Sequence, residues 1–166
     1  MKQKIIGGAV LILVLVGLFW LGSRGQAKAP TAIENSQPSA KLEVNETKYD
    51  FGAISMARGP VSRRFTVKNN STEAVTLESL TTSCMCTNAY FENGSERRGP
   101  FGMVGHGGAV PKLNETILPG ATVTVEAVFD PAAHGPAGVG QIERQIFLRD
   151  SAGGSVVFDI KALVTS

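Results

Sequence analysis

Charged side chains are scarce in this sequence. Only 18% of the 166 residues are charged, whereas 43% are hydrophobic. A disordered chain has too little apolar surface to offset the entropy lost on folding, and a coiled coil needs far more charge than this. Both classes are therefore excluded, and the length fits one domain of ordinary size.

The larger part of the chain also lacks an excess of either charge. The first forty residues contain four basic side chains and one acidic side chain, which gives +3, so residues 41–166 hold 12 of the 16 Lys and Arg and 13 of the 14 Asp and Glu. Their net charge is therefore −1. Because nucleic-acid binding depends on a basic surface, this balance predicts no nucleic-acid partner.

Catalytic motifs are lacking as well. The chain has two histidines and no G-x-S-x-G elbow, so a hydrolase triad has little support. Asp50-Phe51-Gly52 spells the D-F-G of kinases, but no H-R-D sequence accompanies it. The glycine-rich run 102–108 does not link a strand to a helix, so it is not a phosphate-binding loop. None of these motifs therefore implies a catalytic activity.

One long uncharged run lies at the N-terminus. Ile5–Gly22 contains no charged residue, and at about 1.5 Å per residue a helix of this run nearly matches the hydrocarbon core of a bilayer. Lys2 and Lys4 precede it, so the positive-inside rule predicts that residues 1–4 lie in the cytoplasm and that residues 5–22 form a transmembrane anchor. We therefore expect a single-pass protein of the cell membrane, with its C-terminal part in the periplasm or outside the cell.

A cleaved signal peptide is the alternative for this segment, with Ala27 and Ala29 as its A-x-A site. The apolar run is longer than a usual signal sequence and Pro30 would follow the cut, so an uncleaved anchor is favoured. Both interpretations place the rest of the chain outside the cytoplasm. Residues 23–40 are rich in Ala, Ser, Gln and Pro and lack hydrophobic periodicity, which predicts a flexible linker.

From Lys41 onward the apolar residues alternate with a period of two, in short runs separated by turn residues such as Asn69-Asn70-Ser71. This alternation predicts strands around residues 42–44, 61–67, 75–82, 89–91, 123–129, 142–148 and 156–164. Short strands at this spacing are typical of a sandwich of two sheets. We therefore predict an all-β, immunoglobulin-like antiparallel β-sandwich over residues 41–166.

Several motifs in this part of the chain resemble a known family. They are Tyr49-Asp50-Phe51-Gly52-x-Ile54, Phe65-x-Val67-x-Asn69, Thr82-Ser83-Cys84-x-Cys86-Thr87, Pro119-Gly120 and Phe129-Asp130-Pro131. Together they resemble the bacterial domain-of-unknown-function family 1573, over most of residues 41–165. The family's members are similar to the Hydin and major-sperm-protein branch of Ig-like folds, so the resemblance implies an extracytoplasmic, often membrane-anchored sandwich and no known reaction. The chain departs from the family at Met85, where glycine is usual, and in a longer loop over residues 92–118.

The chemistry of the sequence is concentrated in a few soft metal ligands. Cys84 and Cys86 are the only cysteines, and in an extended strand their sulfurs would project from the same face, with Met85 pointing away. The long loop adds Met103 and His106. Thiolate, thioether and imidazole ligands together favour copper, especially Cu(I), over magnesium or calcium, and zinc rarely binds methionine.

Topology places a further ligand near the cysteines. If the strands alternate in direction, the strand ending near Cys84 and the strand ending near Asp130 finish at the same end of the sandwich. His134, in the loop that follows Asp130, would then lie near Cys84 and Cys86. Met103 and His106 would have to reach back from the opposite end. We expect a soft-metal (copper) binding domain with Cys84, Cys86, Met103, His106 and His134 as candidate ligands.

A second interpretation of the cysteines stays open. Outside the cytoplasm, a Cys-x-Cys pair can oxidise to a disulfide, which a bend at Met85 would ease. The pair would then be structural, or it would be a redox-active thiol pair. The domain would in that case be a structural or protein-interaction module, with a protein partner at an exposed sheet edge.

Overall fold

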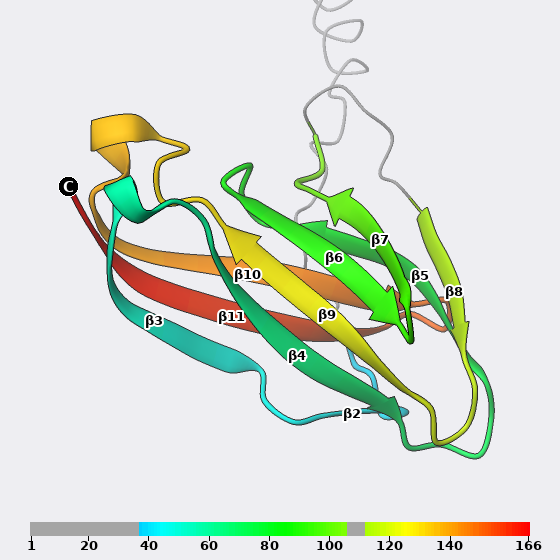
Figure 1. Ribbon diagram of the computed structural model, residues 1–166. Coiled ribbons are helices and arrows are strands. Elements are labelled where there is room, and N and C mark those ends of the chain that lie inside the picture. The colour runs from blue at the N-terminus through cyan, green and yellow to red at the C-terminus, as the bar shows by residue number, and fades with distance from the viewer. Residues whose placement is uncertain (1–36, 106–111) are drawn as a thin grey trace, which may run out of the picture. The chain divides into compact units, whose positions relative to one another are not determined.

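The computed structural model describes residues 37–105 and 112–166, and these form two β-sheets packed face to face (Figure 1). The first sheet has the strand order β1-β11-β10-β5-β8, with β3 also paired to β11, and the second has the order β2-β4-β9-β6-β7. The strands are β1 Gln37–Pro38, β2 Leu42–Val44, β3 Lys48–Ser55, β4 Val61–Asn69, β5 Val75–Thr82, β6 Thr87–Asn93, β7 Glu96–Phe101, β8 Lys112–Ile117, β9 Thr122–Phe129, β10 Gly140–Asp150 and β11 Gly154–Thr165. Two short 3-10 helices, η1 Met56–Arg58 and η2 Gly135–Gly138, lie in the connections.

The N-terminal predictions fall on residues that the structure does not describe. The cytoplasmic residues 1–4, the anchor 5–22 and the linker up to residue 36 all lie outside the described ranges, as does His106. Within those ranges, none of the helices is long and apolar enough to cross a bilayer. The compact unit spans Ser36–Ser166, and its first strand, β1, pairs with β11 inside the stretch expected to be linker.

The core lies between the two sheets. Apolar side chains alternate inward along the central strands, so that Phe65 of β4 and Phe158 of β11 are fully buried. Their rings stack across the two sheets with centroids 4.6 Å apart. This inward alternation is what the period-two pattern predicted, and it confirms an all-β, two-sheet Ig-like sandwich.

Two features of the sheets differ from the sequence prediction. The sandwich is not wholly antiparallel, because β3 and β1 each run parallel to β11. The stretch 92–118 is also not one long loop, because β7 pairs with β6 in a hairpin and β8 pairs with β5. Both strands lie at the edges of their sheets. β7 presents mostly exposed side chains, and in β8 the buried Leu113 and Ile117 are separated by Glu115 at the inward position between them, so neither strand has the alternating apolar pattern that marks the inner strands.

The outer face of the second sheet is covered by paired charges. Arg64 and Arg97 form ion pairs with Glu92 and Glu126, the closest being Arg97 to Glu126 at 2.7 Å. Burial raises the pKa of Glu126, but hydrogen bonds from Arg97 and Ser62 and the nearby arginine charges outweigh it and lower that pKa below its usual value. These cross-strand pairs keep this face solvated and mark it as structural.

Candidate functional site

The two cysteines lie in the turn where the chain passes from the first sheet to the second. β5 ends at Thr82 and β6 begins at Thr87, and the turn between them is closed by a hydrogen bond of 3.1 Å from the Thr87 amide to the Cys84 carbonyl. The hydroxyl of Thr82 lies 3.1 Å from that same carbonyl and 2.9 Å from the carbonyl of Thr87. Both threonines of the T-S-C-x-C-T element are buried, so they hold the shape of the turn.

This turn corrects the prediction of an extended strand through Cys84 and Cys86. The chain bends at Met85, whose side chain is 66% exposed, and the two cysteines form a disulfide with their Cα atoms 5.3 Å apart. This is the Cys-x-Cys disulfide, with a bend at Met85, that the second interpretation of the sequence considered. Cys84 is half-buried, whereas Cys86 is only 2% exposed.

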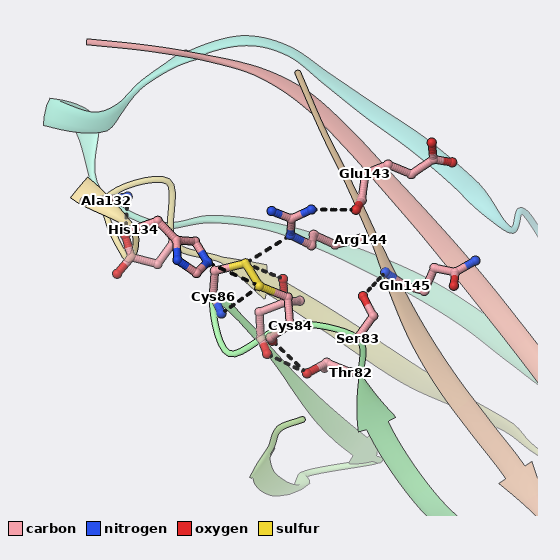
Figure 2. Close-up of a disulfide and its surroundings, with 11 residues drawn as sticks. Thr82, Ser83, Cys84, Cys86, Ala132, His134, Glu143, Arg144 and Gln145 are labelled. Atoms are coloured by element: carbon pink, nitrogen blue, oxygen red, sulfur yellow. Dashed lines mark hydrogen bonds between the residues drawn. A yellow bond between two sulfur atoms is a disulfide. The ribbon is translucent and has the colours of Figure 1, made fainter. Parts of the chain in front are cut away.

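His134 comes to the cysteines from the loop that follows β9, as the topology predicted. The Asp130 amide donates to the Cys86 carbonyl over 2.9 Å, which fixes the start of this loop against the cysteine turn. The ring nitrogen Nε2 of His134 then lies 3.4 Å from Sγ of Cys84 (Figure 2). Gly138 packs so closely behind that an added Cβ would come within 3.2 Å of the His134 Cβ. A glycine at position 138 therefore helps to place the imidazole.

Arg144 is a site residue that the sequence analysis missed. It projects from β10, and its Nε donates to Sγ of Cys86 over 3.2 Å (Figure 2). Its only other hydrogen bond in the described part of the chain is the 2.8 Å contact with the Glu143 carbonyl, and no carboxylate there forms an ion pair with it. Its charge therefore faces the sulfurs. The register of the sheet places it there, because Ile146 pairs with Thr82 in antiparallel strands, which puts Arg144 opposite the cysteine turn.

The predicted ligands Met103 and His106 have different outcomes. After the β6–β7 hairpin the chain returns to the cysteine end, where Met103 forms a bridge with Thr82 and the Thr82 amide donates to the Gly102 carbonyl over 3.2 Å. Met103 is half-buried there. The backbone of Met103 thus lies beside Thr82, whereas His106 lies outside the described residues.

The side chains of Cys84, Cys86 and His134 lie close enough together to bind one metal ion. One ligand atom each from Cys84, Cys86 and His134 lie within 4.8 Å of one another. Two sulfurs and one imidazole are soft or borderline donors, which suit copper or zinc and not magnesium or calcium. Because thiolates are the ligands, a metal can bind both sulfurs only after the disulfide has been reduced. The arrangement therefore provides a disulfide in one redox state and a candidate metal site in the other.

Residues 42–102 match the family described as "Protein of unknown function (DUF1573)". The resemblance noted from the T-S-C-x-C-T element is confirmed, over a shorter stretch than residues 41–165. The match contains Cys84 and Cys86 but ends before His134 and Arg144. No curated protein matches the chain.

Solved structures are similar in fold. A protein of unknown function from Porphyromonas gingivalis W83 aligns with a TM-score of 0.54 and 16% identity, over 80% of this chain and 50% of that one. A family 123 glycoside hydrolase from Clostridium perfringens aligns with a TM-score of 0.50 and 8% identity, over 72% of this chain and 23% of that one. The ASH / PapD-like domain 7 of human CEP192 aligns with a TM-score of 0.45 and 12% identity, over 84% and 96% of the two chains. At these identities the similarity is one of fold alone.

Reducing the disulfide is expected to leave the domain folded. The two cysteines are only two positions apart, so the bond closes a very small loop and removes little entropy from the unfolded chain, worth about 1.5 kcal/mol. A domain of this size is typically stable by about 5–15 kcal/mol. Thermal unfolding with and without a phosphine reductant should therefore show a fall in Tm of several degrees at most. Unfolding on reduction would contradict this expectation and the metal site that depends on it.

Proposed function

We propose that this protein is a membrane-anchored, extracytoplasmic binding domain that takes up a soft metal ion, Cu(I), at Cys84, Cys86 and His134 in the reduced form. The observation that supports it is the placement of two sulfurs and one imidazole nitrogen within 4.8 Å of one another. The anchor and the outward orientation rest on the uncharged run Ile5–Gly22 and the two lysines before it. Catalysis by the metal is not part of the proposal.

The charges around the site favour a monovalent copper ion. Two thiolates bound to Cu(I) form a unit with a net charge of −1, and the guanidinium of Arg144, 3.2 Å from Cys86 Sγ, can balance it. The imidazole of His134 adds a neutral third ligand. Because Cys84 is half-buried and His134 is exposed, an ion can reach the site from solvent. The half-buried Met103, beside Thr82, is the residue best placed to add a thioether contact.

A Cu(I) titration of the full-length chain in detergent tests the proposal. The protein is first reduced and freed of reductant without oxygen, and copper is then supplied from a chromophoric Cu(I) chelator that competes with the site. We expect one ion per chain, loss of stoichiometric binding in Cys84→Ser and Cys86→Ser, and at least about tenfold weaker binding in His134→Ala. Tenfold corresponds to about 1.4 kcal/mol.

Three further measurements sharpen this test. Met85→Leu is the matched control, because Met85 lies between the cysteines but is exposed and should leave the affinity unchanged. His106→Ala shows whether the predicted histidine of the long loop contributes. A parallel titration with Zn²⁺ identifies the metal, since tighter binding of zinc than of copper would contradict the choice of copper. Full binding by Cys86→Ser would contradict the site itself.

A further inference from the structure

The two sulfurs of the disulfide are not equivalent. Cys84 is half-buried and lines a surface pocket together with Ser83, His134, Glu143, Arg144 and Gln145. Cys86 is 2% exposed and does not line this pocket. A thiolate that approaches from solvent can therefore reach Sγ of Cys84 and not Sγ of Cys86. Accessibility decides which sulfur of a disulfide is attacked.

The buried sulfur is equipped to leave as a thiolate. The Nε of Arg144 already donates to Sγ of Cys86 over 3.2 Å, and the hydroxyl of Thr87 lies 3.8 Å from the same sulfur. A guanidinium with no carboxylate partner in the described residues stabilises a neighbouring thiolate strongly, because its charge is not neutralised elsewhere. Better stabilisation of the leaving sulfur makes thiol–disulfide exchange faster.

The half-buried sulfur of Cys84 also has hydrogen-bonding neighbours for the second half of an exchange. The Cys86 amide donates to Sγ of Cys84 over 3.4 Å, and Nε2 of His134 lies at the same distance of 3.4 Å from that sulfur. A thiolate released at Cys84 can therefore accept a hydrogen bond from the Cys86 amide and lies in contact with Nε2 of His134. Each sulfur thus has its own hydrogen-bond donor, the Cys86 amide for Cys84 and the Arg144 guanidinium for Cys86.

We propose that the Cys84–Cys86 disulfide is reduced by thiol–disulfide exchange with an extracytoplasmic protein dithiol, with Cys84 as the attacked sulfur and Arg144 stabilising the Cys86 thiolate that leaves. In the first step a partner thiolate forms a bond to Cys84 Sγ while the Cys84–Cys86 bond breaks, and the electron pair goes to Cys86. In the second step the second thiolate of the partner attacks the partner's first sulfur, which is bonded to Cys84 in the mixed disulfide. The bond to Cys84 breaks, and Cys84 is released as a thiolate. The partner is oxidised to a disulfide, the domain gains two electrons, and the two thiol protons of the partner end on Cys84 and Cys86.

This activity goes beyond metal binding and supplies a step that metal binding needs. In an oxidising compartment the disulfide is the stable form, so the ligands of the proposed copper site become available only through such a reduction. The two proposals fail separately. The copper titration starts from protein that has been reduced beforehand, and the exchange assay contains no metal.

Two measurements on the full-length chain in detergent test the exchange. First, the single-cysteine variants are treated with an aromatic disulfide that releases a coloured thiol. We expect Cys86→Ser, which keeps Cys84, to react at least about tenfold faster than Cys84→Ser, which keeps the buried Cys86. Equal rates, or a faster Cys84→Ser, would overturn the assignment of the attacked sulfur.

The second measurement isolates Arg144. Reduction of the intact disulfide by dithiothreitol, a small dithiol, is followed in stopped flow for wild type, Arg144→Gln and Arg144→Lys. We expect about a tenfold slower reduction in Arg144→Gln and partial rescue in Arg144→Lys, which keeps the positive charge. Arg149→Gln, an exposed arginine on the same strand β10, is the matched control and should reduce at the wild-type rate. An unchanged rate in Arg144→Gln would overturn the role of the guanidinium.

Discussion

Replacing Asn69 with alanine should destabilise the domain by about 3 kcal/mol, although this residue looks like an ordinary turn residue in the sequence. Asn69 is fully buried at the end of β4. Its side-chain amide donates to the carbonyls of Glu73 and Ile117 over 2.7 and 3.0 Å, and its side-chain oxygen accepts from the amide and hydroxyl of Ser71. Alanine would remove all four bonds and leave the carbonyl of the buried Ile117 without this donor, which costs the desolvation of that group in addition to the lost bonds.

Urea unfolding of Asn69→Ala and Asn70→Ala measures the loss in the free energy of unfolding. Asn70→Ala is the matched control, because Asn70 is exposed in the same turn and the change should stay within about 0.5 kcal/mol. A difference of about 2 kcal/mol or more between the two variants is expected. If Asn69→Ala is no less stable than Asn70→Ala, the hydrogen bonds from Asn69 do not hold the ends of β4 and β8 together.

The inner strands of the sandwich could be predicted from the sequence because each has one face in the core. Phe65 and Val67 on β4, and Phe158 and Ile160 on β11, alternate with less buried residues, and this alternation is visible without a structure. The edge strand β7 is mostly polar and carries no such signal, so the sequence pattern predicts a loop there. Whether β3 pairs parallel or antiparallel depends on the path of the chain between the sheets, which the sequence pattern does not encode.

The candidate site likewise has features that could be predicted from the sequence and features that could not. The alternation of strand direction was enough to predict that His134 lies near Cys84 and Cys86. This prediction needs only that the strand before Cys84 and the strand before His134 end at the same end of the sandwich. A bend at Met85 follows from the sequence only as the condition for a disulfide. The turn itself depends on hydrogen bonds from the Thr82 hydroxyl and the Thr87 amide, and both of these buried threonines look like ordinary strand residues in the sequence. Arg144 needed the register of β5 against β10, which is known only once the fold is.

Replacing Thr82 with valine should lower stability by about 2 kcal/mol and weaken Cu(I) binding by about tenfold, while both cysteines and His134 remain in place. Valine has the same shape as threonine, so the packing at this position, which is 3% exposed, should not change. The hydroxyl, however, is the group that bonds the carbonyls of Cys84 and Thr87. Without it, the cysteine turn loses the contact that fixes the distance between its two ends, and the two sulfurs are less well ordered for one ion.

Thr81→Val separates this effect from a general effect of valine in β5. Thr81 is the preceding residue on the same strand, it is only half-buried, and the described residues offer its hydroxyl no hydrogen-bond partner, so its replacement should change neither stability nor copper affinity. The copper titration and urea unfolding are run on both variants. Tight copper binding in a destabilised Thr82→Val would mean that the threonine stabilises the fold without ordering the sulfurs. Weak binding in both variants would mean that β5, and not the threonine hydroxyl, positions the turn.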